Sequence, residues 1–326
     1  MQKKRIDYDA AAKFLLENDN YIILAHQNPD GDSIGGGFAL CYALRKMGKN
    51  ANVLCSDEFP GRYDYITKDC PPNKFKYDTI ISIDVADKAL LGSNLSHYGD
   101  YVKLAIDHHK SNTGFAAMTL LDSKAAAACE VVFELLLRLK TEIDTTIAEC
   151  LYTGIVTDTG CFKYSCVTKK THLIAAELMD YDINFDRINR QMFEIKTKGR
   201  IELEKYIISN IEYFLDDKCA LIVLTKDIIE SLDAQTSDFE GISNLTLQLE
   251  TTHVGIVIKE RDEGKFKISM RSVSSVDVSD ICAQLDGGGH VRAAGCLLEG
   301  TIERVKRKIL SVVAPALGMN LWLIDN

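Results

Sequence analysis

Residues 21–40 read YIILAHQNPDGDSIGGGFAL, and this stretch decides the fold that the sequence predicts. Its first five residues are apolar and β-prone, which is typical of a strand buried on both faces of a parallel sheet. A turn follows, in which Pro29 and Gly31 separate His26, Asp30 and Asp32. From residue 32 onward, apolar side chains recur at near-helical spacing. We therefore expect a strand, a polar turn and a helix, in that order.

The polar turn falls where α/β proteins bind their ligands, in the crevice at the carboxyl ends of the strands. One imidazole and two carboxylates in this position, from His26, Asp30 and Asp32, suit divalent cations such as Mn²⁺ or Mg²⁺. Carboxylates are also common in turns that bind nothing, so for this stretch alone both interpretations stay open.

The gross composition predicts an ordinary globular protein of two domains. The chain has 326 residues, of which 46% are hydrophobic and 26% charged, with only five prolines, so disorder is not indicated. The net charge of -9 and the pI near 5.4 argue against a protein that tracks long nucleic acid through a basic groove. A short anionic ligand, held by metal ions and a few local cations, fits this composition.

Ten cysteines without any CxxC pair indicate buried thiols in a reducing compartment rather than a zinc site or a disulfide framework. The N-terminal residues contain no apolar run of signal-peptide length, and no stretch approaches the length of a membrane span. We therefore expect a cytoplasmic protein without a membrane partner.

Strands that alternate with helices follow the opening stretch, and this order is typical of a mainly parallel, doubly wound α/β sheet. Two of the strands end directly on polar residues, at Asp84 and at Asp107. Strands are predicted at residues 51–55, 77–84, 101–107 and 117–121, and helices at 6–18, at 125–139 and from 145.

The remainder of the chain changes character. Residues 186–212 are helical and charged, which predicts a connector between a first domain of residues 1–185 and a smaller α+β domain of residues 213–326. Short β-like runs at 220–225, 253–260 and 265–271 belong to the second domain, with a hairpin turn at 261–264. Trp322 is interpreted as a packing anchor.

Four separate segments deliver carboxylates and imidazoles to strand ends or to a Gly/Thr-rich turn. Side by side, so many negative charges are costly unless cations are bound. Two divalent ions would neutralise the cluster, position a bridging water and lower its pKa, which serves displacement at phosphorus. The residues concerned are His26, Asp30, Asp32, Asp84, Asp107, His108, His109 and Asp158.

These motifs resemble the DHH/DHHA1 phosphoesterase family, and within it most closely the stand-alone NrnA type, over nearly the whole chain. The resemblance rests on five motifs in order. They are HQNPDGDS at residues 26–33, Asp84 after an apolar strand, Asp107-His108-His109, TDTG at residues 157–160, and GGGHVRAAG at residues 287–295.

The resemblance implies a role for each residue of the first domain. One ion would be held by His26, Asp30 and Asp84, and the other by Asp32, Asp84, His108 and Asp158, with Asp84 bridging. His109 would face the substrate phosphate, and Asp107 would orient the histidines. The resemblance makes Mn²⁺ the expected ion, with Mg²⁺ or Co²⁺ as alternatives.

In the second domain, the resemblance implies that Arg271, Ser272 and His290, with the glycines, bind the nucleotide. The glycines are Gly287, Gly288 and Gly289. Taken alone, a strand-end arginine and a glycine run are also explained by a solvated charge and a flexible loop. Three positions depart from the family pattern: Gly36, where many relatives have serine, Asp286, where they have a further glycine, and Cys161, where arginine or serine is expected.

The expected function is therefore a two-metal phosphoesterase that degrades very short single-stranded RNA to mononucleotides and dephosphorylates 3′-phosphoadenosine 5′-phosphate (pAp). No long nucleic acid is expected as a partner, and a homodimer is compatible with the sequence. One alternative is a phosphodiesterase for linear or cyclic dinucleotide messengers such as pApA or cyclic di-AMP. Another, from a different class, is a catalytically silent nucleotide-binding regulator, which the complete set of proposed ligands disfavours.

Overall fold

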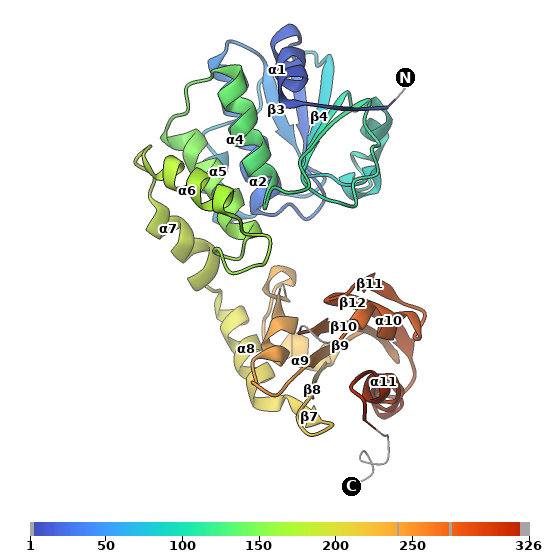
Figure 1. Ribbon diagram of the computed structural model, residues 1–326. Helices are drawn as coiled ribbons and strands as arrows, with labels where there is room; N and C mark the ends of the chain where they lie inside the picture. Colours follow the sequence, from blue (N-terminus) through green and yellow to red (C-terminus); the bar gives the residue numbers. More distant parts are fainter. Residues whose placement is uncertain (1–2, 240, 274–275, 320–326) are drawn as a thin grey trace. The chain divides into compact units, whose positions relative to one another are not determined.

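The computed structural model describes residues 3–239, 241–273 and 276–319, so Trp322 lies outside the described residues. The chain divides into two compact units, Met1–Ile195 and Lys196–Asn326 (Figure 1). Residues 186–212, predicted as a connector, hold the helices α7 (Phe185–Asn189) and α8 (Lys198–Asn210), and the division falls between these two helices. A short π-helical turn, η4 (Arg190–Glu194), follows α7 directly.

The first unit contains a six-stranded sheet in which every pairing is parallel, in the order β1-β6-β5-β4-β2-β3. The predicted parallel α/β sheet is confirmed. The edge strand β1 was not predicted, because it is three residues long and two of them are charged. The strands are β1 (Lys4–Ile6), β2 (Tyr21–Leu24), β3 (Ala51–Leu54), β4 (Thr79–Ile83), β5 (Leu104–Asp107) and β6 (Met118–Leu121).

The strand order changes direction between β2 and β4. From β2 the chain winds outward to β3, and it then returns to the other side of β2 to form β4, β5 and β6. Connections on either side of such a switch point leave a crevice at the carboxyl ends of the strands. The ends of β2 and β4 therefore flank the place where a parallel sheet accommodates a ligand.

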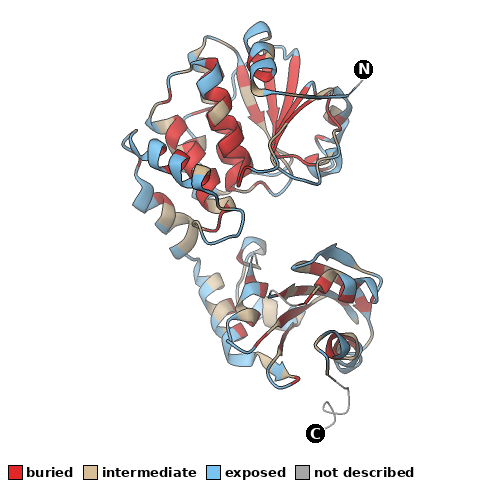
Figure 2. Cartoon of the chain, viewed as in Figure 1, coloured by how far each residue is buried: buried red, intermediate tan, exposed pale blue. Residues whose placement is uncertain are grey.

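Helices cover one face of this sheet, and short 3-10 helices cover the other. Ile23, Ile81 and Ile106 belong to a buried cluster with α1, α2, α4 and α5 (Figures 1 and 2). Ile22 and Ile80, on the opposite face, pack with the 3-10 segments between β4 and β5. The helices are α1 (Tyr8–Glu17), α2 (Gly31–Lys46), α3 (Asp64–Thr67), α4 (Ala128–Leu139), α5 (Thr145–Asp158) and α6 (Lys169–Met179), with 3-10 turns η1 (Gly61–Tyr63), η2 (Lys88–Leu91) and η3 (Ser96–Tyr101).

Helices α2 and α5 approach each other closely because glycines line their contact. A Cβ atom on Gly35 of α2 would lie 2.3 Å from the backbone oxygen of Cys150 in α5, and one on Gly154 of α5 would lie 2.8 Å from a carboxylate oxygen of Asp32 in α2. Gly36 is likewise closely packed, because a Cβ atom on it would lie 2.9 Å from Cγ2 of Ile83 in β4. Close packing of these helices requires residues without side chains.

The second unit is a mixed sheet with the order β11-β12-β10-β9-β8-β7, in which only β8 and β9 pair in parallel. This agrees with the predicted α+β domain. Helices α10 and α11 pack on one face. The elements are β7 (Glu212–Phe214), β8 (Cys219–Leu224), α9 (Lys226–Ser231), η5 (Thr236–Phe239), η6 (Ile242–Leu247), β9 (Val254–Asp262), β10 (Lys265–Ser272), α10 (Val278–Ala283), β11 (Gly288–His290), β12 (Ala293–Glu299) and α11 (Ile302–Ala316).

The glycine run of the second unit forms a strand rather than a loop. Residues 288–290 form β11, which pairs with β12 in a hairpin. Glycine-rich strands carry no apolar pattern, so the sequence did not predict this hairpin. Asp286, just before it, has a φ of +58°, a left-handed conformation that glycine adopts more easily and aspartate tolerates. A glycine at this position would adopt the same conformation without strain.

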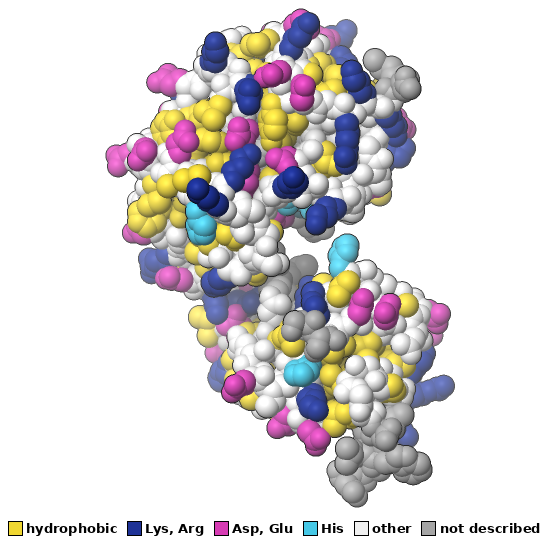
Figure 3. Space-filling model, in the orientation of Figure 1, with side chains coloured by type: hydrophobic (Ala, Val, Ile, Leu, Met, Phe, Trp, Pro, Cys, Tyr) yellow, Lys and Arg dark blue, Asp and Glu magenta, His cyan; other side chains and the backbone are white. Residues whose placement is uncertain are grey.

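Two surface properties bear on function. On the face shown in Figure 3, basic and acidic side chains are interspersed on each unit rather than segregated. Within the described part of the chain, no helix is both long enough and apolar enough to cross a membrane.

The contact between α2 and α5 generates a stability prediction. Replacing Gly35 by Ala should lower the free energy of unfolding by about 1–3 kcal/mol, because the methyl group would overlap the Cys150 carbonyl oxygen. Thermal or urea unfolding measures the effect. The matched control is Gly61→Ala, where the nearest atom would be 4.0 Å away, so stability should hardly change. Equal unfolding free energies for both variants would contradict the proposed packing role.

Candidate metal centre

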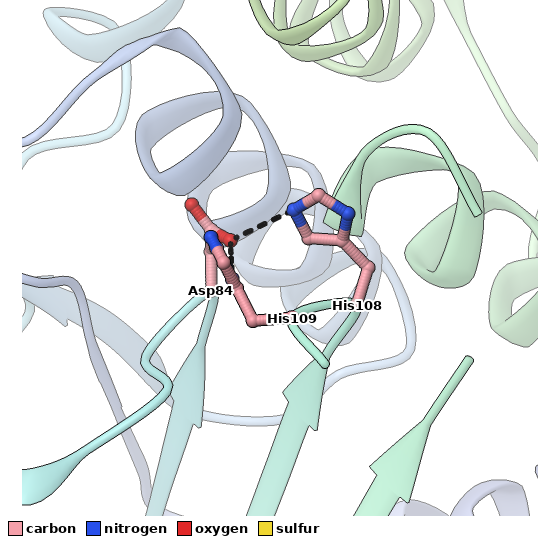
Figure 4. A group of neighbouring side chains, drawn as sticks. All are labelled: Asp84, His108 and His109. Atoms are coloured by element: carbon pink, nitrogen blue, oxygen red, sulfur yellow. Dashed lines mark ion pairs between the residues drawn. The ribbon is translucent and has the colours of Figure 1, made fainter. Parts of the chain in front are cut away.

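The carboxyl edge of the first sheet gathers most of the predicted site residues. His26 lies two residues beyond β2, Asp84 directly follows β4, and Asp107 is the last residue of β5. The histidine pair comes next, as Figure 4 shows for His108 and His109 beside Asp84. The start of α2 contributes Asp30 and Asp32, and the end of α5 contributes Asp158.

Asp158 was predicted to lie in a Gly/Thr-rich turn, and this prediction was wrong. Helix α5 continues through Gly154 and ends at Asp158 itself, with Thr159 as its C-cap residue. The glycine belongs to the packed contact with α2, where helix continuity is favourable in spite of its low helix propensity.

Two groups of ligand atoms meet at this edge. In the first, Nε2 of His26 lies 3.5 Å from a carboxylate oxygen of Asp30 and 3.6 Å from one of Asp84. The Nδ1 atom of His26 lies 2.8 Å from the backbone oxygen of Gln27, which directs Nε2 toward the carboxylates. These side chains are close enough together to hold a metal ion.

In the second group, Nε2 of His108 lies 3.4 Å from a carboxylate oxygen of Asp158 and 3.8 Å from one of Asp32. It lies 3.5 Å from Oδ1 of Asp84 as well (Figure 4). Nδ1 of His108 lies 3.2 Å from the backbone oxygen of Ala125. Asp84 therefore belongs to both groups, between the two histidines.

Asp84 is held in an unusual position. Its φ of +59° lies in the left-handed region, and its side chain is only 4% exposed. Aspartate adopts this conformation more readily than most residues, and strained backbone often occurs at functional sites. Here the turn directs the carboxylate away from the line of β4 and into the cluster.

The cluster contains buried polar atoms that form no hydrogen bond. They include Oδ1 of Asp84 and Nε2 of His108, although Nδ1 of His109 lies 3.2 Å from the same Oδ1 atom. The proton on that Nδ1 is better placed for Asp107, at 2.9 Å. Buried polar atoms without partners are costly, and a divalent cation would satisfy both. The residues present thus fit a metal ion.

The pKa shifts at this site indicate the same need for positive charge. Burial raises the pKa of Asp158 to about 8, and the charge of Asp32 adds to the rise. Burial and the carboxylates of Asp84 and Asp30 likewise raise the pKa of Asp32 well above its usual value. Burial acts to lower the pKa of His26, but the carboxylates of Asp30 and Asp84 raise it to about 11. Protons therefore accumulate here, and cations would displace them.

The start of α4 holds Asp32. Its carboxylate is fully buried and accepts hydrogen bonds from the backbone N–H groups of Ala128 (2.5 Å) and Cys129 (2.9 Å). These are N–H groups without partners in the first turn of a helix, where a negative charge is favoured. The sequence did not reveal this contact, because backbone donors have no residue signature.

Asp107 positions the histidine pair through hydrogen bonds. Its Oδ1 accepts hydrogen bonds from the backbone N–H groups of His108 (2.8 Å) and His109 (3.2 Å). Its Oδ2 accepts one from the Asn112 side chain at 2.5 Å, a contact that the motifs did not indicate. Hydrogen bonding to Asp107, together with the nearby negative charge of Asp84, raises the pKa of His109 to about 11.

His109 is the most exposed member of the cluster, with 44% of its side chain accessible. Its Nδ1 is also close enough to Asp84 and His108 to share a metal ion with them. The role predicted for it, at the substrate phosphate, stays a prediction, as do the ligand roles of the other residues.

The substrate residues predicted in the second unit lie on neighbouring strands. Arg271, near the end of β10, pairs with Ala293 of β12, and His290 of β11 pairs with the same residue. Ser272 is buried and its hydroxyl donates to the backbone oxygen of Val276 at 2.6 Å. That contact favours a positioning role for Ser272 over direct substrate binding.

Two of the three glycines have no room for a side chain. A Cβ atom on Gly287 would lie 2.3 Å from the Gly295 oxygen, and one on Gly289 would lie 2.5 Å from the Ala293 oxygen. Nothing lies within 4 Å of the corresponding position on Gly288. The run therefore keeps β11 close to β12 and leaves backbone exposed at Gly288.

Comparison with known proteins places both units in characterised domain families. Residues 20–155 match the DHH family, N-terminal domain, and residues 222–317 match the DHHA1 domain. The first range contains seven of the eight clustered residues, and only Asp158 lies just beyond it.

Relatives and solved structures extend the match over most of the chain. The bifunctional oligoribonuclease and PAP phosphatase NrnA of Thermus thermophilus is 28% identical, over 89% of this chain and 88% of its own length. A probable NrnA of Streptococcus mutans is 26% identical, over 85% and 89%.

Among solved structures, an exopolyphosphatase-related protein from Bacteroides fragilis has a TM-score of 0.84 at 28% identity and 95% coverage of both chains. Exonuclease RecJ bound to manganese, at 14% identity and a TM-score of 0.52 with 98% coverage of both chains, shares the fold. The two matched domains and these relatives show that the chain belongs to the DHH/DHHA1 phosphoesterase family.

Proposed function

We propose that this protein is a two-metal phosphoesterase that degrades very short oligoribonucleotides to mononucleotides and dephosphorylates pAp. The observation that carries the proposal is the cluster around Asp84, in which buried carboxylate and imidazole atoms lack hydrogen-bond partners. The names of the relatives from Thermus thermophilus and Streptococcus mutans, which cover most of this chain, support the choice of substrates.

Two divalent ions fit the donor set. His26, Asp30 and Asp84 would hold one ion, and the group of His108 with its neighbouring carboxylates would hold the other. When bound, such ions neutralise the carboxylates, act as Lewis acids on a phosphoryl oxygen and lower the pKa of water. A mixture of imidazole and carboxylate donors favours Mn²⁺, with Mg²⁺ and Co²⁺ as alternatives.

His109 is suited to act on the phosphate. Hydrogen bonding to Asp107 and the nearby charge of Asp84 raise its pKa, so the imidazole is protonated at neutral pH and presents positive charge toward solvent. A cation placed where charge develops on the phosphoryl oxygens stabilises the transition state. Asp107 acts through His109 and through the backbone that precedes it, as a positioning residue.

The second unit would bind the nucleotide. Arg271 forms no ion pair with any described residue, so its guanidinium is available for a phosphate. The exposed backbone at Gly288 and the exposed imidazole of His290 lie on the same hairpin. Gly287 and Gly289 contribute by letting this hairpin close tightly.

The surface charge supports a short substrate. Positive charge is interspersed with negative charge on the face shown in Figure 3, and the chain carries a net charge of -9. Long nucleic acids are bound mainly through rows of phosphate contacts, which need a continuous basic track. All ten cysteines are free thiols, which supports a cytoplasmic location.

A substrate panel tests the proposal. With Mn²⁺ present, we expect turnover of pAp and of oligoribonucleotides of two to five residues, and much slower turnover of long RNA, because few cations would bind a long chain. Product release measured by chromatography reports each rate. Faster turnover of long RNA would contradict the proposal, as would turnover of cyclic di-AMP or tripolyphosphate alone.

Replacing Asp84 by Asn should reduce turnover by more than about 100-fold. Mutating even a residue that hydrogen-bonds to a metal ligand lowers activity or metal affinity by about 10- to 100-fold. The increase in melting temperature on adding Mn²⁺ should shrink as well, because Asp84 lies 3.6 Å from Nε2 of His26 and 3.5 Å from Nε2 of His108. The control is Asp100→Asn, an exposed carboxylate paired with Lys88. A variant with normal turnover and a normal Mn²⁺ response would exclude Asp84 as a ligand.

Replacing Asp107 by Asn should move the alkaline limb of the pH dependence of kcat to lower pH. The Asp107 carboxylate is the largest cause of the raised pKa of His109, so without its charge the imidazole loses its proton at lower pH. Rates on pAp across the alkaline range measure the shift, with Asp100→Asn as the control. An alkaline limb that stays in place would show that the protonation of His109 is not used.

A further inference from the structure

In the described part of the chain, one face of β10 and β12 belongs to no buried hydrophobic cluster. On this side, a buried cluster includes α8, η6 and residues of β8 and β9, but among the described residues it includes none from β10 or β12. Helices α10 and α11 pack on the opposite side. The uncovered surface, here called the β10–β12 face, is formed by Lys265, Lys267, Ser269 and Arg271 of β10 and by Ala293, Gly295, Leu297 and Glu299 of β12.

Strand register connects the β10–β12 face to the proposed substrate residues. Residues directly opposite each other in an antiparallel pair point to the same side of the sheet. Arg271 and His290 both pair with Ala293, so they share this face. Lys267, paired with Leu297, lies four residues before Arg271 on the same strand and the same side. The face is therefore continuous with the surface proposed to bind the nucleotide.

A pocket of about 840 Å³ lies on the β10–β12 face. Its lining includes Lys267 and Leu297, together with backbone of Gly288 and Gly295. Leu297 is 72% exposed, more than any other large apolar side chain in the described residues. An exposed apolar side chain next to accessible backbone offers van der Waals contact to the face of a nucleobase.

The pocket lining contains three basic side chains, Arg261, Lys265 and Lys267, and three acidic ones, Asp262, Asp286 and Glu299. Within the part of the chain that is described, Lys267 forms no ion pair, whereas the nearby acids Asp262 and Glu299 are paired with other lysines at 3.4 Å and 3.8 Å. Lys259, opposite Lys267 on β9, has its ammonium over the Phe239 ring. An unpaired lysine next to a second cation attracts a phosphate.

The remaining acid at the pocket has a complementary use. Asp286 lines it, and its left-handed backbone fixes it at the start of β11. A carboxylate repels phosphate, but it accepts hydrogen bonds from a ribose hydroxyl or an exocyclic amine. A pocket that offers the unpaired Lys267, the exposed Leu297 and the carboxylate of Asp286 therefore matches a whole ribonucleotide rather than inorganic phosphate.

We propose that the pocket on the β10–β12 face binds a further nucleotide of an oligoribonucleotide whose terminal nucleotide is held at Arg271 and His290. The inference rests on the proposed function and names the part of the substrate that this pocket takes. Four residues of strand separate Lys267 from Arg271 by ~13 Å, further than the two phosphates of one nucleotide are apart. The pocket thus contributes to longer substrates and not to pAp.

The test compares substrates of different length. For Lys267→Gln and for Leu297→Ser, kcat/KM on a pentanucleotide should fall by about three- to tenfold, the effect of losing one phosphate contact or one apolar contact. On pAp and on a dinucleotide, kcat/KM should stay within about twofold of the wild type, because these ligands do not reach the pocket. The control is Lys308→Gln, on α11, which packs against the opposite face of the sheet.

A second readout separates this inference from the proposed function. Binding of a fluorescent pentaadenylate in EDTA, measured by anisotropy, should weaken by the same factor in both variants, whether or not the enzyme turns the ligand over. Absence of any nucleotide turnover in the wild type would refute the proposed function, while this binding comparison would still decide the role of the pocket. The inference would be overturned if kcat/KM fell equally for pAp and the pentanucleotide. It would also be overturned if the variants bound pentaadenylate as tightly as the wild type.

Discussion

Repulsion among buried carboxylates is the constraint on which the rest of the first unit depends. Asp32 and Asp84 are almost completely buried within reach of Asp30 and Asp158, and a low-dielectric interior does not tolerate such a group of charges without compensation. In the protein chain alone, compensation comes from histidine protons and helix N–H groups. The buried carboxylates thereby lower the free energy of unfolding, and they form a site that cations would occupy.

The architecture brings this cluster together from rigid parts. Strands β2, β4 and β5 end at one edge of a parallel sheet, at the point where the strand order reverses. Helix α2 begins at that edge and α5 ends there, and the close contact at Gly35 and Gly154 sets their separation. Because the strands and both helices are buried, ligand atoms from distant parts of the chain are held within a few ångströms of one another.

The sequence predicted those features that repeat or that carry a side-chain signature. Alternating strands and helices indicated the parallel sheet, and carboxylates at strand ends indicated where His26, Asp84 and Asp107 would meet. It did not predict the β11–β12 hairpin, because glycines carry no apolar alternation, nor the helical position of Asp158, because Gly154 suggests a turn. Both failures occur where tertiary packing overrides local propensity.

The anchoring of Asp32 at the start of α4 has a consequence for how such sites diverge. Main-chain amides are supplied by any residue except proline, so this attachment exerts almost no selection on which amino acids occupy positions 128 and 129. Burial restricts both positions to small side chains, but the anchor itself needs only their backbone N–H groups. A comparison of sequences therefore shows Asp32 as a shared acid and gives no sign of the two N–H groups that hold it.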